Sequence, residues 1–130
     1  LVCGGLHGVM DAAAHGAKQA GGCTIGVLPG HDRSAANPFI DHAITTGLGE
    51  ARNLVVVSSG DAVIAVGGSY GTLSEIGLAA KIGRPVVILE GWRLETSGPA
   101  AASGRPGIYY AHSPQEAVEL ALGLIERPVP

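Results

Sequence analysis

Short apolar runs alternate with longer amphipathic stretches along this chain. The apolar runs predict strands at residues 1–3, 24–28, 42–46, 62–66, 86–89 and 108–111. The stretches between them repeat their apolar positions at helical spacing and predict helices at residues 8–20, 48–58, 72–82 and 113–125. Strands that alternate with helices indicate an α/β fold, in which a doubly wound parallel sheet carries helices on both faces.

Local signals mark where several of these elements begin and end. Gly21 and Gly22 stop the first helix, and the sequence Gly83-Arg84-Pro85 breaks the third. Ser113 is followed by a proline and then by Glu116, which predicts an N-cap, a proline at the first helical position and an acid at the third. Residues 91–107 are rich in Gly, Pro, Ser and Ala and predict a mobile surface loop.

The length of 130 residues, of which 46% are hydrophobic, is enough for one core. We therefore expect residues 1–130 to form a single domain. The chain opens on Leu1 inside a predicted strand, so we expect it to lack the first strand and helix of the complete doubly wound sheet.

Composition narrows the classes of partner. The net charge is −3, and no run of Lys and Arg provides a nucleic-acid surface. No apolar stretch reaches the roughly 18 residues of a membrane span, which favours a cytoplasmic protein. Cys3 and Cys23 lie beside apolar runs and are expected to be reduced, buried thiols. The five histidines lack metal-ligand spacing, so no metal site is predicted.

The most informative stretch is residues 65–76, where an apolar run ends in a glycine-rich turn and restarts as a helix. Glycines let the backbone approach a ligand, and the first turn of a helix offers unpaired N–H groups at the positive end of its dipole. This pattern predicts a phosphate site. Its candidate ligand-binding residues are Gly68, Ser69, Tyr70, Gly71 and Thr72.

A second glycine cluster, residues 3–8, also follows a strand and opens a helix, with Gly4, Gly5 and Gly8 as candidate ligand-binding residues. It approximates a dinucleotide-binding turn whose first glycine is replaced by Cys3, and Asp32 is the candidate ribose partner. Both turns follow strands of a parallel sheet, so we expect them to converge on one crevice.

Two side chains near these turns have open roles. Glu75 follows Thr72 at the spacing of a capping box, so its carboxylate either caps the helix or touches a ribose or a water as a catalytic group. Arg52 is either a solvated surface residue or a bidentate partner of a phosphate. The residues alone leave both alternatives open.

Residues 67–75 resemble the P-G-G-x-G-T-x-x-E signature of the LOG (Lonely Guy) proteins, which are often misannotated as lysine decarboxylases. Arg52 strengthens the resemblance, because residues 50–53 stand at the family's distance before residues 60–62. The likeness is closer to the molybdenum cofactor carrier proteins of that superfamily. It runs through four stretches: residues 25–30, 32–34, 36–38 and 49–53.

The resemblance implies a Rossmann-like fold, a homodimer, and a ligand phosphate on the glycine turn. The leading hypothesis is a carrier-like protein that binds a phosphorylated nucleotide- or pterin-like ligand, with molybdenum cofactor as candidate cargo and no required cofactor. The alternative is a LOG-type phosphoribohydrolase, in which Arg52 and Glu75 would serve cleavage of the N-glycosidic bond of a nucleoside 5'-monophosphate. Gly67, Ser69 and Asn53 depart from the LOG pattern and loosen the enzymatic inference more than the binding one.

Overall fold

The computed structural model describes residues 1–95 and 107–126, which form two compact units. The first unit is Leu1–Ser59 and the second is Gly60–Pro130. Each unit is described by itself, and the expected single domain stays a prediction. Most of the loop expected at residues 91–107 lies outside the described residues, and its first part, residues 91–95, has no helix or strand.

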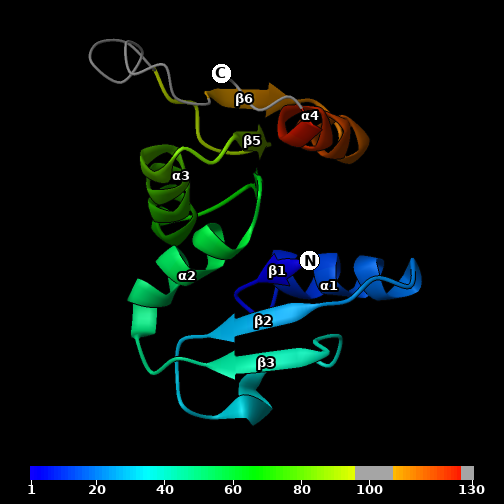
Figure 1. Cartoon of the computed structure of the whole chain (residues 1–130), viewed down its shortest axis with the longest axis vertical. Coiled ribbons are helices and arrows are strands. Elements are labelled where there is room, and N and C mark those ends of the chain that lie inside the picture. The colour runs from blue at the N-terminus through cyan, green and yellow to red at the C-terminus, as the bar shows by residue number, and fades with distance from the viewer. Residues whose placement is uncertain (96–106, 127–130) are drawn as a thin grey trace. The chain divides into compact units, whose positions relative to one another are not determined.

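The first unit is a three-stranded parallel sheet in the order β1-β2-β3 (Figure 1). Val2 of β1 pairs with Ile25 of β2, and Ile25 pairs with His42 of β3. The elements of this unit are β1 (Val2–Cys3), α1 (Val9–Gln19), β2 (Ile25–Leu28), the short 3₁₀ helix η1 (Arg33–Ala35), β3 (His42–Thr45), the 3₁₀ turn η2 (Gly49–Ala51) and α2 (Arg52–Ser59).

The central strand β2 supplies most of the core of this unit. Val27 and Leu28 are each 1% exposed, and Val57 of α2, a helix that packs against β1 and β2, is equally buried. Burial of such side chains is the main stabilising contribution, at about 25 cal/mol for each Å² of apolar surface removed from water.

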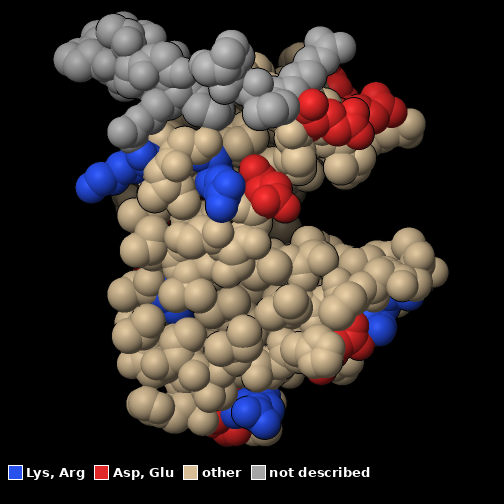
Figure 2. Space-filling view, viewed as in Figure 1, with Lys and Arg blue, Asp and Glu red and all other residues tan. Residues whose placement is uncertain are grey.

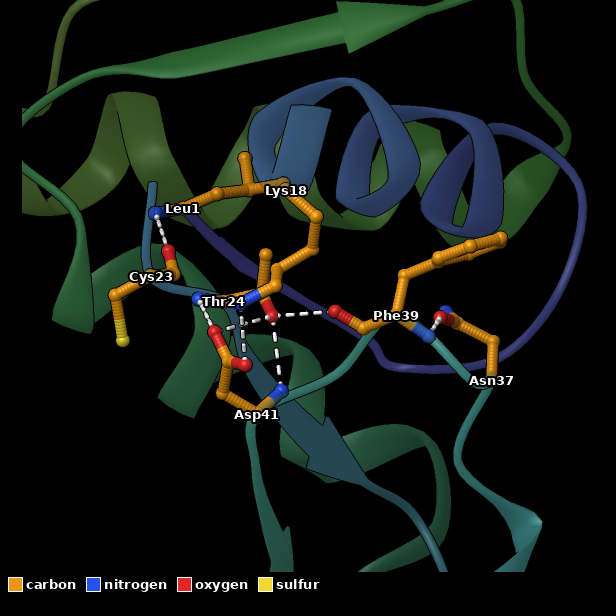
Figure 3. A network of polar contacts seen from close by, with 7 residues as sticks. All are labelled: Leu1, Lys18, Cys23, Thr24, Asn37, Phe39 and Asp41. Atoms are coloured by element: carbon orange, nitrogen blue, oxygen red, sulfur yellow. Dashed lines mark hydrogen bonds and ion pairs between the residues drawn. The ribbon is translucent and has the colours of Figure 1, made fainter. Parts of the chain in front are cut away.

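A polar network ties the start of β2 to the start of β3 (Figure 3). The Thr24 backbone N–H donates to the Asp41 carboxylate at 2.9 Å, and the Asp41 N–H donates to the Thr24 hydroxyl oxygen at 2.9 Å. Lys18 of α1 donates to the other Asp41 oxygen at 2.7 Å. The bond from Lys18 and then that from the Thr24 N–H lower the pKa of Asp41 from 3.8 to about 2.

We expect Asp41→Asn to destabilise the fold near neutral pH. Because the folded-state pKa is depressed, the stabilisation is present above the unfolded value of 3.8 and is lost as the pH falls through about 2. The thermal unfolding midpoint, followed by circular dichroism, should therefore be lower in the variant near neutral pH and converge with that of the unsubstituted chain as the pH falls through about 2. Asp61→Asn, at an exposed carboxylate of the other unit, is the matched control. Equal midpoints near neutral pH would contradict this role of Asp41.

The second unit is a three-stranded parallel sheet in the order β4-β5-β6. Val63 pairs with Val86, and Val86 pairs with Ile108. The elements are β4 (Val63–Val66), α3 (Tyr70–Ile82), β5 (Val86–Leu89), β6 (Ile108–Ala111) and α4 (Pro114–Glu126).

The central strand β5 is buried on both faces. Val87 and Leu89 cluster with Ala117 and Ala121 of α4, which lies along β5 and β6 in Figure 1. Since alternate strand residues point to opposite faces, the other two residues of β5 face away from α4, and α3 also packs against β4 and β5. This double coverage explains why all four residues of β5 are apolar.

The predicted start of α4 is confirmed. The Glu116 N–H donates to the Ser113 hydroxyl at 3.1 Å, and the Glu116 carboxylate accepts from the His112 N–H at 2.7 Å. Two backbone N–H groups at this helix end, those of Glu116 and His112, are thereby satisfied by side chains, as in a capping box.

The predicted α/β class with parallel strands is confirmed in both units. The expectation of buried thiols is wrong, because Cys3 is only half-buried and Cys23 is exposed, although both are free. Cys23 lies in the link before β2 rather than in the strand, so its side chain faces solvent. No helix among residues 1–95 and 107–126 is long and apolar enough to cross a membrane.

Charge is spread thinly on the surface. In Figure 2 acidic side chains gather over α4, whose sequence contains three glutamates, and basic side chains form small separate groups. The absence of nucleic-acid partners stays a prediction from the sequence.

Candidate functional site

The first glycine turn joins β1 to α1 and lies directly over β2. Gly5 has a φ of 75°, and a Cβ at that position would come within 3.0 Å of the Gly26 Cα. Gly8, with a φ of 74°, is the N-cap of α1. Glycine is required at these places because a side chain at positive φ is strained and the turn approaches the strand backbone closely.

Asn37 braces this turn from a distant loop. Its side-chain amide donates to the Leu6 carbonyl at 2.7 Å, and its backbone N–H donates to the Gly5 carbonyl at 2.8 Å. The side-chain oxygen accepts from the Phe39 N–H at 3.0 Å, so this 2%-exposed asparagine is well satisfied. Sequence reasoning noticed Asn37 only within the carrier-like stretch 36–38, since nothing local shows that residue 37 meets residues 5 and 6.

Arg52, the first residue of α2, is buried against the first glycine turn. Only 9% of its surface is exposed, so the solvated alternative is wrong. A Cβ at Gly4 would overlap the Arg52 guanidinium and lie 2.6 Å from the Met10 sulfur. The absent side chain of Gly4 is therefore what makes room for the guanidinium beside the turn.

Nε of Arg52 lacks a hydrogen-bond partner. Among the described residues it is the one buried side-chain nitrogen or oxygen atom in that condition. A buried donor on a cationic group costs free energy when it is left unpaired, and native proteins seldom keep one without a reason. An anion that accepts from this face of the guanidinium would remove the cost.

The start of α1 adds a second source of positive potential to the same turn. Gly8 has no side chain to cap the helix. The first backbone N–H with a partner in the helix is that of Ala12, which donates to the Gly8 carbonyl at 3.1 Å. The amides of residues 9–11 therefore form an uncapped helix start. The uncapped helix start and the buried guanidinium at this glycine turn are both features that favour a nearby anion.

The second glycine turn follows β4 and opens α3. Gly67 has a φ of 59° and Gly68 a φ of 118°, and the Gly67 N–H donates to the Leu89 carbonyl at 2.9 Å. Ser69 is the N-cap but its hydroxyl makes no capping bond. The first helical N–H with an intrahelical partner is that of Leu73, which donates to the Ser69 carbonyl at 3.1 Å. The amides of residues 70–72 thus form a second uncapped helix start.

The helix begins two residues earlier than the sequence predicts. Because Tyr70 is its first residue, Thr72 stands at the third helical position and cannot be the N-cap. The capping-box interpretation of Thr72 with Glu75 is therefore wrong. Instead the Thr72 side chain packs over Gly68, where a Cβ would lie 2.5 Å from the Thr72 Cβ. Glu75 is half-buried in the second turn of the helix.

The second turn requires glycine at position 68, where a side chain would clash with Thr72, but not at position 71, where a side chain has room. We expect Gly68→Ala to lower the free energy of unfolding by about 1–3 kcal/mol, because the new Cβ meets Thr72 at an unfavourable φ. Gly71→Ala is the matched control, since its nearest neighbour would be the Ser69 hydroxyl at 3.9 Å. Alanine in the first helical turn should be neutral or stabilise by up to about 1 kcal/mol. Urea denaturation measures both; a Gly68→Ala variant as stable as Gly71→Ala would contradict this view of the turn.

Asp32 has a local structural role. Its carboxylate accepts from the Ser34 hydroxyl at 2.7 Å and from the Ser34 N–H at 2.8 Å, and caps η1. These bonds, the side-chain bond first, lower the pKa of Asp32. The role accounts for the residue without a ribose. Among the described residues, no group of three or more His, Cys, Asp or Glu side chains is placed to hold a metal ion.

The predicted site residues thus fall into two groups. Arg52, Gly4, Gly5 and Gly8 belong to the first unit, where Arg52 meets Gly4 directly. The second unit holds the rest, namely Gly68, Ser69, Tyr70, Gly71, Thr72 and Glu75. Convergence of the two turns on one crevice stays a prediction.

Comparison with known families assigns the chain. Residues 1–118 match the SLOG cluster4 family, and the chain belongs to it. The resemblance to LOG and molybdenum cofactor carrier proteins that the glycine motifs indicate is thereby confirmed.

Two solved structures share the fold. The molybdenum cofactor binding protein of the phototrophic bacterium Rippkaea orientalis is 42% identical, with a TM-score of 0.83 over 96% of this chain and 77% of that one. The molybdenum cofactor carrier protein of Chlamydomonas reinhardtii is 36% identical, with a TM-score of 0.80 over 98% of this chain and 78% of that one. This chain is therefore Rossmann-like and structurally similar to molybdenum cofactor carriers.

Two curated relatives are also similar. An uncharacterized protein of Archaeoglobus fulgidus is 47% identical over 100 residues, which are 72% of this chain and 66% of that protein. The cytokinin riboside 5'-monophosphate phosphoribohydrolase of Mycobacterium tuberculosis is 33% identical over 101 residues, which are 71% of this chain and 54% of that protein. The aligned segments thus span less than two thirds of each relative.

Proposed function

We propose that this chain binds a phosphorylated nucleotide- or pterin-like ligand and acts as a carrier of the molybdenum cofactor type. The observation that carries the proposal is the buried guanidinium of Arg52, which lies against the side-chain-free Gly4 and whose Nε has no hydrogen-bond partner. A phosphate would accept from this donor and from the uncapped amides of α1.

The kind of ligand is supported by the similar structures, which are named for molybdenum cofactor binding and carriage. The molybdenum cofactor combines a pterin ring with a terminal phosphate, so an anion site is one of the two things that a carrier needs. In this proposal the cofactor is cargo, and the protein holds it without changing its covalent structure. A homodimer in the cytoplasm is the proposed state of the carrier.

Arg52→Met should weaken phosphate ligands without unfolding the protein. Loss of a charge-assisted hydrogen bond costs about 1.5–3 kcal/mol, or roughly 10- to 150-fold in affinity. Removal of a buried, incompletely paired charge should leave the ligand-free chain as stable or more stable. Isothermal titration with AMP and with ribose 5-phosphate measures the first effect, and urea denaturation the second.

Arg33→Met is the matched control, because Arg33 is an exposed arginine of the same unit and should leave both measurements unchanged. Gly4→Ala tests the position of the Arg52 guanidinium, because the new Cβ would displace it. Gly16→Ala in α1 is the control for this variant, because its Cβ would meet nothing within 4 Å. Arg52→Met and Arg33→Met variants with the same affinity for AMP would remove Arg52 from the site.

A second function is supported by the phosphoribohydrolase relative. In that alternative Arg52 would hold a nucleoside 5'-monophosphate, and Glu75 would assist water attack or stabilise the cationic sugar. The chain keeps both residue types but has Gly67, Ser69 and Asn53 where the LOG pattern has proline, glycine and lysine. Cleavage depends more strongly than binding on exact side-chain placement, which favours the carrier.

We expect no release of adenine and ribose 5-phosphate when the chain is incubated with AMP, although AMP binds. Chromatography of the reaction mixture over time measures the release. Turnover that disappears in both Glu75→Gln and Arg52→Met would instead support the hydrolase. Turnover that survives in both variants would come from a contaminating enzyme and would leave the carrier proposal standing.

A further inference from the structure

Beside the second glycine turn, the aromatic side chains of Tyr70 and Trp92 lie in contact with each other. Tyr70, the first residue of α3, is 80% exposed. Its ring lies 5.6 Å from that of Trp92, centroid to centroid, with a tilt of 43°. Tyr70 is the most exposed of the large hydrophobic side chains in the described residues. An aromatic ring exposed to water does not contribute the stabilisation that its burial would give, unless a ligand or another surface covers it.

Trp92 is held in place by the turn that it adjoins. Its indole N–H donates to the Ser69 carbonyl at 3.1 Å. One residue earlier, Gly91 approaches the Gly67 carbonyl so closely that a Cβ at position 91 would overlap it. The segment after β5 is therefore anchored to the glycine turn at two consecutive residues.

Tyr110 of β6 fixes the other end of this segment. Its hydroxyl accepts from the Leu94 N–H at 2.9 Å and donates to the Leu94 carbonyl at 3.2 Å. The Arg93 guanidinium lies over the Tyr110 ring, 4.6 Å from its centroid. Trp92 thus stands between two fixed points, so its orientation is preorganised, which lowers the entropy lost when a ligand binds.

We propose that Tyr70 and Trp92 form an aromatic subsite for the fused nitrogen heterocycle, of purine or pterin type, of a phosphorylated ligand. The proposal rests on the proposed function for the kind of ligand, and the ring pair also adjoins the uncapped start of α3, a second place that can take a phosphate. Stacking on aromatic side chains tolerates different ring systems, because every such heterocycle has a π face. The subsite therefore selects for a planar ring rather than for one base.

Tyr70→Ala is expected to weaken AMP by about 5- to 100-fold and to leave ribose 5-phosphate unchanged, because only AMP carries a ring to stack. Tyr70→Phe retains the ring and should bind AMP as the unsubstituted chain does. Ile82→Ala, an exposed apolar side chain at the far end of α3, is the matched control and should change neither ligand. Isothermal titration measures the affinities, and neopterin serves as the pterin probe.

Trp92 provides a second readout, because it is the sole tryptophan of the chain. AMP and adenosine should quench its fluorescence, excited at the red edge of its absorption, whereas ribose 5-phosphate should not. Quenching by adenosine with no binding of ribose 5-phosphate would support the ring subsite and overturn the phosphate site.

The converse result separates the two proposals in the other direction. If Arg52→Met weakens both AMP and ribose 5-phosphate while Tyr70→Ala weakens neither, the phosphate site stands and the aromatic subsite is overturned. Absence of any quenching or ring-dependent affinity with AMP, adenosine and neopterin would likewise overturn the subsite.

Discussion

The buried guanidinium of Arg52 is the constraint around which the first unit is arranged. Placing a permanent positive charge at 9% exposure beside a glycine turn costs desolvation free energy. The fold accepts that cost with one donor, Nε, unsatisfied. Several features keep the arrangement in place: Gly4 leaves the space, Gly5 lets the turn lie on β2, and Asn37 ties the turn to a distant loop. A buried positive charge kept at such a cost is typical of ligand sites, where a bound anion compensates the charge.

The helix starts differ in whether a side chain caps them. Helix α4 is capped by Ser113 and Glu116, which satisfy its first amides and make it a purely structural element against β5 and β6. Helices α1 and α3 follow glycine turns and have no side-chain cap. A missing cap costs on the order of 1 kcal/mol of stability. In the proposed function the first amides of α1 bind the ligand phosphate, and the start of α3 adjoins the proposed aromatic subsite.

The similar proteins are named for two different activities, carriage of the molybdenum cofactor and phosphoribohydrolysis of a cytokinin riboside 5'-monophosphate. Carriage requires affinity and protection, whereas N-glycosidic cleavage also requires groups held in register with the reacting bond. In this chain the buried guanidinium of Arg52 and the uncapped start of α1 both lie at the first glycine turn. The chain departs from the LOG pattern at Gly67 and Ser69, in the turn before Glu75, and at Asn53, next to Arg52. The aromatic pair Tyr70 and Trp92 adds recognition of a ring, which serves either purpose.

The sequence by itself determined the α/β class, the parallel strands and both glycine turns, because periodicity, glycine and capping residues act over a few neighbouring positions. It also predicted the start of α4 correctly. Only the tertiary structure decided that Arg52 is buried against Gly4, that Asn37 braces residues 5 and 6, and that Trp92 meets Tyr70. These contacts join residues 22 to 48 positions apart, and such pairings depend on how the strands and loops come together in the folded chain. The start of α3 was misplaced for a related reason: Thr72 has the composition of a cap, but its packing over Gly68 puts it inside the helix.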